Sequence, residues 1–276
     1  MTSGRVVSAV SDDGGMARRT TKNGAGEMSG SDGSRNGSGK GSGKGTLGKG
    51  SSARTGAVKV PAARRPEVRL PPLSPYEGGL DPDGDYDGLE FRDLDLAGQE
   101  GPGARFIDCA LHDCALDETD LGAARFIDCR LSGVRGVGTD LGGASLRDVE
   151  ILDARLGGTQ LQGAVLERVL IRGGKIDYLN LRQAKLKDVV FEGVVLSEPD
   201  FGGASLERVE FLDCVLGRVD FSAVRMKDVD LRTVAELDIA RGVERLAGAV
   251  ISSAQLLALA PSFAAQIGVR VEDTLG

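Results

Sequence analysis

One large apolar residue recurs at every fifth position from Phe91 to Leu231. Of the 29 positions in this register, 27 hold Leu, Ile, Met or Phe, and only Gly101 and Gly136 depart from it. Neither the 3.6-residue period of an α-helix nor the two-residue period of a flat strand produces a strict five. A fixed repeat of this length indicates a solenoid, in which short units stack on one another.

The position two residues before each large apolar centre is also restricted, because it is nearly always small or β-branched. Ala104, Cys109, Thr119 and Val134 are examples. Residues two apart on an extended backbone point the same way, so each unit turns one small and one large side chain inward. The other three positions are mostly polar or glycine, which fits a short one-sided segment followed by a turn.

Near-identical stretches give the number of units in one coil. Residues 104–109 recur almost unchanged at 124–129, and residues 119–122 recur at 139–142, both at an offset of 20 residues. Twenty residues are four units, so we predict a four-sided coil. The 29 units make about seven coils, which span roughly 34 Å at the ~4.8 Å spacing of hydrogen-bonded strands.

The units resemble those of the pentapeptide-repeat family, which read A-(D/N)-(L/F)-x-x; residues 119–123 and 199–203 are close matches. The resemblance implies an all-β solenoid, a right-handed quadrilateral β-helix, over residues 91–234. It implies no single function, although the best-understood members bind DNA gyrase by mimicking DNA and confer quinolone resistance. This chain departs from the family pattern where basic residues take the Asp/Asn position, as at Arg105, Arg125, Arg135, Arg155 and Lys175.

The chain divides by composition around the repeat. Residues 1–70 carry 13 Lys/Arg and 5 Asp/Glu, whereas residues 71–276 carry 21 and 36. A Gly/Ser/Lys/Arg-rich segment buries too little apolar surface to offset its chain entropy, so we predict a disordered tail over 1–75 and a lead-in over 76–90. The tail has no apolar stretch typical of a secretory signal, and Met16 and Met28 are alternative candidate starts.

Residues 235–276 lose the five-residue pattern, and we predict a helical cap that covers the last coil. Ser252 or Ser253 suits the N-cap of a helix through Leu259, and Pro261 suits the first turn of a second helix that ends at Gly268. The segment also resembles the C-terminal tail of gyrase-targeting pentapeptide proteins, which implies a homodimer. The candidate cap or dimer residues are Leu256, Leu257, Phe263 and Ile267.

The sequence contains few residues in arrangements typical of an active site. The four cysteines fall in the small inward position, where they serve as small buried hydrophobes rather than as a metal site. The single histidine, His112, follows a centre and is expected to be solvated, with no Ser–His–Asp arrangement around it. There is no P-loop, no HExxH motif and no GxGxxG that follows a predicted strand. We therefore predict a cytoplasmic protein that is not an enzyme, binds no cofactor or metal and has no membrane span.

The remaining sequence feature that bears on function is the distribution of charged residues. Residues 20 apart stack, so one line along the coil carries acidic residues with small neighbours, and Arg182 is the only charge among those neighbours. The candidate partner face is Glu100, Asp120, Asp140, Asp200 and Asp220. Asp or Asn at this position is also the family consensus, so the alternative interpretation is that these residues serve the coil backbone rather than a partner.

Residues 85–234 carry 18 basic and 28 acidic residues, about half the charge density of duplex DNA over the predicted length. Two functions remain open. One is a scaffold that binds an unidentified protein through this face, and the other is a DNA mimic that modulates DNA gyrase. Neither involves direct duplex binding by the acidic rod.

Overall fold

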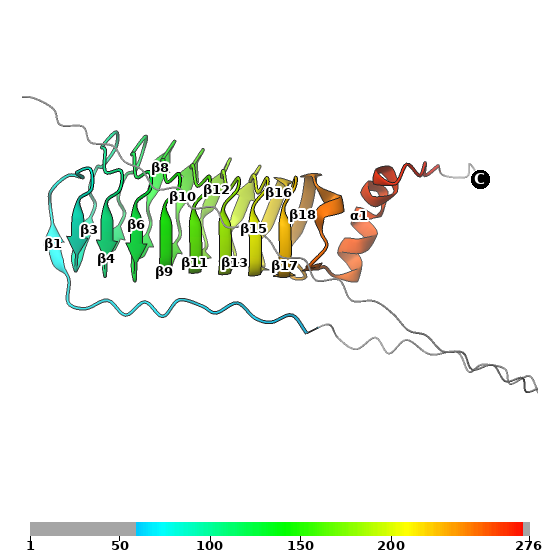
Figure 1. Ribbon diagram of the computed structural model, residues 1–276, viewed down its shortest axis with the longest axis horizontal. Helices are drawn as coiled ribbons and strands as arrows, with labels where there is room; N and C mark the ends of the chain where they lie inside the picture. Colours follow the sequence, from blue (N-terminus) through cyan, green and yellow to red (C-terminus); the bar gives the residue numbers. More distant parts are fainter. Residues whose placement is uncertain (1–58, 273–276) are drawn as a thin grey trace, which may run out of the picture. The chain divides into compact units, whose positions relative to one another are not determined.

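The structure is a computed structural model that describes residues 59–272. Most of the tail predicted to be disordered, residues 1–58, lies outside the described residues, as do residues 273–276. The described part is a rod of stacked coils followed by one helix (Figure 1). Along one line, residues at intervals of 20 from Tyr86 to Met226 pair successively in parallel, which makes eight coils.

Two parallel sheets form three sides of the rod. We number the four faces by the centres of one coil, with Phe106 on the first face, Leu111 on the second, Leu116 on the third and Leu121 on the fourth. The larger sheet covers the first and second faces and contains β1 (Ser74–Tyr76), β2 (Asp85–Asp87), β3 (Leu89–Arg92), β4 (Arg105–Ile107), β5 (Ala110–His112), β6 (Arg125–Ile127), β7 (Arg130–Ser132), β9 (Ser145–Leu152), β11 (Val165–Arg172), β13 (Lys185–Glu192), β15 (Ser205–Leu212), β17 (Arg225–Asp230) and β19 (Ala249–Val250). The smaller sheet forms the third face from β8 (Arg135–Val137), β10 (Arg155–Gly157), β12 (Lys175–Asp177), β14 (Val195–Ser197), β16 (Val215–Asp220) and β18 (Glu236–Arg241).

The fourth face is held mainly by single bridges between residues 20 apart, from Glu100 to Asp220, and β16 and β18 extend onto it only at the last coil, where Asp220 pairs with Arg241. The predicted four-sided β-solenoid is therefore confirmed, with strand partners 20 residues apart except at its two ends. The first coil already begins within residues 76–90, where β2 pairs with β4. Sequence reasoning assigned this stretch to a lead-in because its apolar centres are less regular.

The core is the column of inward side chains that the five-residue repeat supplies. Phe106 stacks on Phe126 with ring centroids 4.6 Å apart, and Phe191 stacks on Phe211 at 4.8 Å. All four rings are at most 2% exposed. Burying a phenylalanine of this kind contributes about 1.5–3 kcal/mol, so regular stacking over many coils accounts for the stability of the rod.

The corners of the coil explain why glycine and aspartate are frequent two residues after each apolar centre. At this position the backbone adopts the left-handed conformation: Asp108, Asp128 and Asp148 have φ values of 50°, 53° and 53°, and Gly133 has 64°. Glycine adopts this conformation without strain, and aspartate tolerates it better than most residues. The repeat therefore specifies turns as well as a core.

Gly136, an exception to the apolar register, sits where the third face comes close to the preceding coil. A Cβ atom at Gly136 would lie 2.7 Å from the carbonyl carbon and oxygen of Leu116, closer than such atoms approach. Two threonines near Gly136, one coil apart, differ in their hydrogen bonds. Thr139 donates its hydroxyl to the Leu116 carbonyl at 2.7 Å, whereas the buried Thr159 hydroxyl has no partner among the described residues.

Residues 59–73 form an extended segment, called the strap below, that runs alongside the rod (Figure 1). The strap belongs to the stretch predicted to be disordered, but within the described residues it makes side-chain contacts with coils far away in sequence. The Arg64 guanidinium, for example, donates a hydrogen bond to the Asp188 carboxylate. Its conformation depends on these long-range contacts, which local composition does not reveal.

The C-terminal segment contains a short 3-10 helix, η1 (Val243–Arg245), and one α-helix, α1 (Ser253–Gln266). The predicted N-cap at Ser252 is present as a capping box with Gln255, and the Gln255 side chain donates to the Leu231 carbonyl at 2.7 Å. The predicted break at Pro261 is wrong, because α1 continues through it. In the described part of the chain, no helix has the length and hydrophobicity needed to cross a membrane.

Candidate functional site: an acidic ladder and a basic groove

The fourth face brings the sequence-predicted acidic residues into one line. Parallel bridges join Glu100, Asp120 and Asp140 in succession, continue through Gln160 and Asn180, and reach Asp200 and Asp220. We call these seven residues the acidic ladder. Consecutive members are one coil apart, ~4.8 Å along the rod axis. The neighbours of the first half are small, with Gly122 and Gly142 following Asp120 and Asp140.

Each ladder aspartate also has a structural role. The Oδ1 atom of Asp120 accepts a hydrogen bond from the Gly122 N–H at 2.8 Å, and Asp140 accepts one from Gly142 at 2.7 Å. Asp200 and Asp220 make the same bond two residues ahead, both at 2.7 Å. An Asx turn of this kind stabilises the chain where it leaves the face. The bond uses one carboxylate oxygen and does not neutralise the charge.

The two halves of the ladder differ in their counter-charges. Arg182 forms an ion pair with Asp200 at 2.9 Å, and Arg241 approaches Asp220 to 3.5 Å. Burial acts to raise the pKa of Asp220, but its hydrogen bonds with Ser222 and the nearby arginines outweigh that effect and lower the pKa. Within residues 59–272, Glu100, Asp120 and Asp140 have no ion-pair partner, so negative charge concentrates on the first half.

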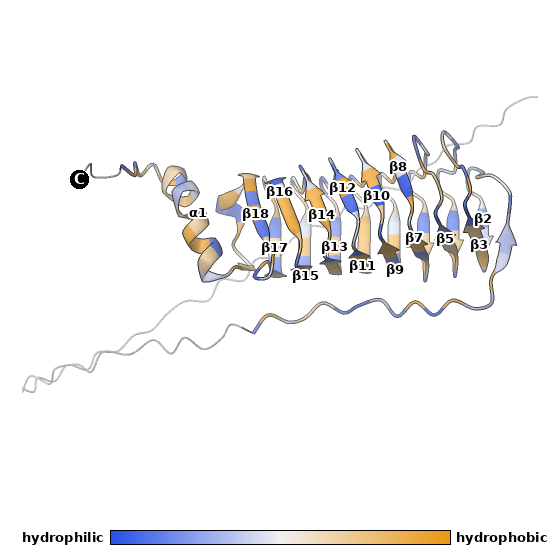
Figure 2. Ribbon diagram, turned by 180° about the vertical axis from the view of Figure 1, so that it is seen from behind, coloured by the Kyte–Doolittle hydropathy of each residue, from blue (hydrophilic) through white to orange (hydrophobic). Residues whose placement is uncertain are grey.

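The predicted cap residues are distributed unevenly over α1. Leu256, Leu257 and Ile267 are 52%, 76% and 77% exposed, and Phe263 is partly buried. Leu259 is the buried residue of the helix. Figure 2 shows the resulting mixture of apolar and polar residues on α1. The helix therefore covers the last coil through few of its side chains and presents large apolar side chains to solvent.

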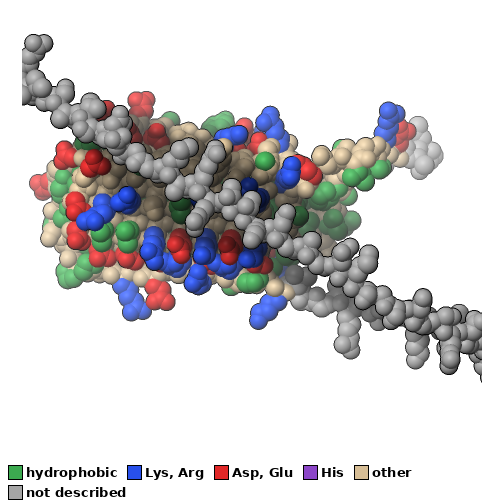
Figure 3. All heavy atoms as spheres, viewed as in Figure 1, with side chains coloured by type: hydrophobic (Ala, Val, Ile, Leu, Met, Phe, Trp, Pro, Cys, Tyr) green, Lys and Arg blue, Asp and Glu red, His purple; other side chains and the backbone are tan. Residues whose placement is uncertain are grey.

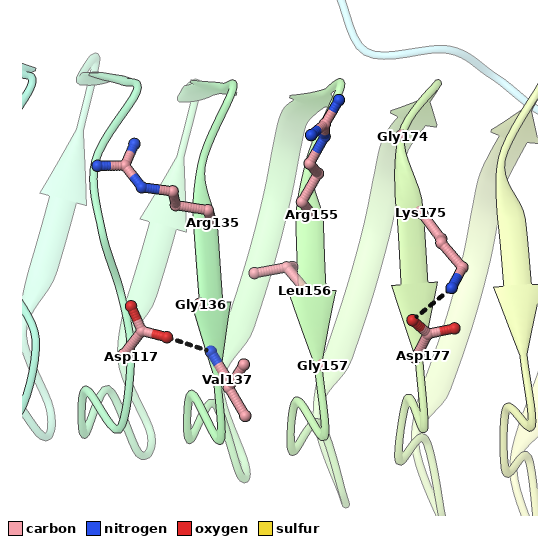
Figure 4. Close-up of a pocket in the computed structure, with 10 residues that line it drawn as sticks. All are labelled: Asp117, Arg135, Gly136, Val137, Arg155, Leu156, Gly157, Gly174, Lys175 and Asp177. Carbon is pink, nitrogen blue, oxygen red and sulfur yellow. Dashed lines mark hydrogen bonds and ion pairs between the residues drawn. The ribbon is translucent and has the colours of Figure 1, made fainter.

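A groove of about 590 Å³ lies on the third face, which sequence reasoning noted only as a line of basic residues. Arg135, Arg155 and Lys175 line it from successive coils, and Leu156 points toward the strand that carries Gly136 (Figure 4). Lys175 pairs with Asp177 at 2.8 Å. Asp117 and Asp177 line the groove as well, so its charge is mixed, and its lining contains no nucleophile with an adjacent base.

His112 is less solvated than expected. Its Nδ1 atom lies 2.5 Å from the Ser132 hydroxyl oxygen, and its Nε2 atom lies 3.7 Å from a Glu90 carboxylate oxygen. The second distance exceeds a hydrogen bond, and Arg92 already pairs with Glu90. Ser132 is 20 residues after His112, so the coil period would have revealed this contact from the sequence.

The four cysteines occupy the interior, each 0% exposed and none in a disulfide. The Cys129 thiol donates to the Phe106 carbonyl at 3.4 Å. Burial raises the pKa of Cys114 and Cys214, which keeps these thiols protonated. Among residues 59–272, no group of three or more His, Cys, Asp or Glu side chains is arranged to hold a metal ion.

Comparison with protein families matches two models. One, described as a pentapeptide repeat region, covers residues 104–181, and the other, described as pentapeptide repeats (8 copies), covers residues 178–211. The matched stretch includes Asp120, Asp140 and Asp200 of the ladder. No significant match to this chain was found among curated proteins.

Among solved structures, the chain is similar to a trypsin-treated variant of QnrB1, a plasmid-mediated fluoroquinolone resistance protein. The identity is 18% and the TM-score 0.38, over 73% of this chain and 100% of that one. It is also similar to HetL, a pentapeptide-repeat protein involved in heterocyst differentiation regulation from the cyanobacterium Nostoc sp. strain PCC 7120. That identity is 17% and the TM-score 0.27, over 62% of this chain and 90% of that one. Neither likeness is close enough to transfer a partner or an activity.

Proposed function

The chain is a pentapeptide-repeat protein, and from this premise we propose that its rod is a non-enzymatic scaffold that binds a protein partner through the first half of the acidic ladder. Glu100, Asp120 and Asp140 carry the binding charge. The observation that supports the proposal most strongly is that these three carboxylates stand one coil apart and unpaired within the described residues.

The shape of this surface favours a flat, basic partner. Gly122 places no side chain beside Asp120, whereas the Gln162 amide lies against Gly142, so a partner surface can approach the backbone most closely at Gly122. Lysines and arginines of the partner would meet charge that is not already neutralised, which mainly increases the association rate and the specificity. Asp200 and Asp220 lie on the same line. Neighbouring arginines partly neutralise their charge, so we expect them to contribute less to partner binding.

The thiols and the histidine give this scaffold little chemistry of its own. The cysteines are enclosed in the core, and His112 is engaged by Ser132. Four unpaired thiols also favour a reducing compartment, which supports the cytoplasm as the location.

The proposal is tested by site-specific photo-crosslinking in the native cells. A photoreactive residue at Gln162, which is exposed beside Asp140 on the ladder face, should form a specific crosslinked product. The matched control is Asp87, which is exposed at the equivalent position of the first face. A specific product at Gln162 that disappears with Asp120→Asn and Asp140→Asn supports the proposal. No product at Gln162, or the same product at both positions, refutes it.

The narrower alternative is that the partner is DNA gyrase and that the ladder mimics DNA. One carboxylate per ~4.8 Å approaches the 3.4 Å charge spacing of a single DNA strand. Gln160 and Asn180 interrupt the line, however, and leave only short acidic runs. We expect any gyrase effect to appear in a supercoiling assay at micromolar protein, with and without a quinolone. No effect under these conditions would rule out gyrase but leave the scaffold function open.

We also propose that α1 joins two copies of the chain through Leu256, Leu257 and Ile267. Three exposed large apolar side chains on one helix and its C-cap residue are an unfavourable surface for a monomer. Leu257→Asp should convert a dimer into a monomer in sedimentation equilibrium, whereas Ser262→Asp on the same helix should not. A monomeric mass for the wild-type protein would contradict this dimer.

A further inference from the structure

The strap runs along the corner between the first and second faces and is held there by acidic side chains. The Ala63 N–H donates to Glu210 at 2.8 Å, Arg64 pairs with Asp188 at 2.8 Å, and Arg65 pairs with Glu192 at 2.7 Å. Lys/Arg and Asp/Glu side chains alternate along the lower edge of the rod in Figure 3. We call the surface formed by Asp148, Asp188, Glu192 and Glu210 the acidic channel.

Asp188 is the centre of these contacts. Arg64 donates to its carboxylate from the backbone N–H, Nε and Nη2, at 3.2, 3.1 and 2.8 Å. Arg208 donates to the same carboxylate at 2.7 and 2.9 Å from the other side. The Asp188 side chain is 0% exposed as a result. Burial acts to raise the pKa of Asp188, but the arginine hydrogen bonds outweigh it, and the pKa lies well below its usual range.

The same Arg–Asp pair occurs two coils earlier, where the strap arginines lie nearby but donate no hydrogen bond to the aspartate. Arg168 pairs with Asp148 through two hydrogen bonds of 2.6 Å, as Arg208 pairs with Asp188. The Asp148 side chain is 20% exposed, against 0% for Asp188. Beside it lies a hollow of about 500 Å³ lined by Arg64, Arg65, Glu67, Asp148 and Arg168. The rod therefore carries the arginine-binding arrangement twice, and the strap occupies one copy.

The strap is held less firmly than the coils it covers. Residues 59–73 add no strand to either sheet, and Pro66 and Val68 are its buried side chains. The Arg64 and Arg65 side chains remain 62% and 42% exposed, so water competes for both ion pairs. Elements with few buried contacts and no sheet hydrogen bonds open at lower free energy than the rest of a domain.

We propose that the strap is an intramolecular ligand and that the acidic channel binds an extended, arginine-bearing segment of a partner protein when the strap is displaced. The strap itself defines the chemistry of that segment. Two consecutive arginines reach Asp188 and Glu192, and a backbone N–H before them reaches Glu210. The groups that the strap contacts, Asp188, Glu192 and Glu210, are all carboxylates, which favours a cationic peptide over nucleic acid although Arg168 and Arg208 lie on the same surface. The channel lies away from the acidic ladder, so this inference does not depend on the proposed function.

A trans-binding experiment on the full-length chain tests the proposal. The probe is a fluorescent peptide with the strap sequence Val60–Leu70, and the readout is fluorescence anisotropy. In the wild-type protein the tethered strap has a high effective concentration and competes with the peptide. The double variant Arg64→Ala with Arg65→Ala removes this competition, so we expect it to bind the peptide at least tenfold more tightly than the wild type does.

Four controls distinguish the possible outcomes. Arg69→Ala, which loses only an exposed pair with Glu67, should bind the peptide as weakly as the wild type. A peptide with both arginines replaced by alanine should bind no variant. Adding Glu192→Gln to the double variant should reduce its affinity, and Asp120→Asn with Asp140→Asn should not. Equal peptide binding by wild type and double variant, or no binding by a double variant with native circular dichroism, overturns the proposal.

Discussion

Asp188 and Asp120 are the same residue type on the same rod, yet their surroundings differ completely. Asp188, under the strap, is enclosed by the guanidinium groups of Arg64 and Arg208 and has no exposed surface. Asp120, on the acidic ladder, accepts one backbone N–H and has no ion-pair partner within the described residues. The coil fixes where each carboxylate stands, and residues outside the repeat pattern decide whether it stabilises the fold or remains free to bind.

The largest expected effect is on stability at the strap corner. Asp188→Ala removes the carboxylate that accepts from both Arg64 and Arg208, and we expect it to lower the free energy of unfolding by about 2–3 kcal/mol. Asp120→Ala removes only an Asx-turn acceptor and should cost about 1 kcal/mol. Urea denaturation of both variants measures the difference. Equal losses of unfolding free energy in the two variants would contradict the difference between the strap corner and the acidic ladder.

The same contrast predicts a pH dependence. The pKa of Asp188 is lowered in the folded protein, so its contribution to stability is complete above its unfolded pKa of about 3.9 and is lost as the pH falls through the folded value. We expect the urea midpoint of the wild type to fall more steeply below pH 4 than that of Asp188→Asn. Parallel curves for the two proteins between pH 7 and 3 would contradict this assignment.

Two threonines one coil apart extend the comparison into the core. Thr139→Val removes a hydroxyl that donates to the Leu116 carbonyl, and it should destabilise the protein by about 1 kcal/mol. Thr159→Val removes a buried hydroxyl that has no partner among the described residues, and it should be neutral or stabilising. Thermal unfolding of the pair is the measurement, and a larger loss for Thr159→Val would be the contrary result.

The smallest effect is expected at the ladder itself. Asp120→Asn keeps the side-chain oxygen that accepts the Gly122 N–H and removes only the charge. Its free energy of unfolding should stay within about 0.5 kcal/mol of the wild-type value, as for surface changes in general. Urea denaturation showing a loss above 1 kcal/mol would mean that the charge itself stabilises the coil.

Much of the rod follows from the five-residue register and the offset of 20. These two features predict the four sides, the buried cysteines and the ladder line from Glu100 to Asp220. The same offset would also have paired His112 with Ser132. The strap was not predictable in this way, because Arg64 meets Asp188 across 124 residues and no local pattern encodes that contact.

The helix through Pro261 shows a different limit. Proline removes a helical hydrogen bond and usually marks a helix boundary, which is why the sequence favours two helices. The carbonyl left without that bond belongs to Leu257, whose residue is 76% exposed. Water can therefore satisfy the carbonyl, and the surrounding Ala and Leu residues carry the helix onward. The sequence alone does not show that Leu257 is exposed.

The central claim is that the unpaired half of the acidic ladder carries the partner contact. The most direct test is the dissociation constant of the crosslinked partner for two charge-neutral variants. Asp120→Asn with Asp140→Asn should weaken binding at least tenfold, whereas Asp200→Asn with Asp220→Asn, on the arginine-paired half, should change it less than threefold. Equal weakening by both variants, or none by the first, would contradict the account.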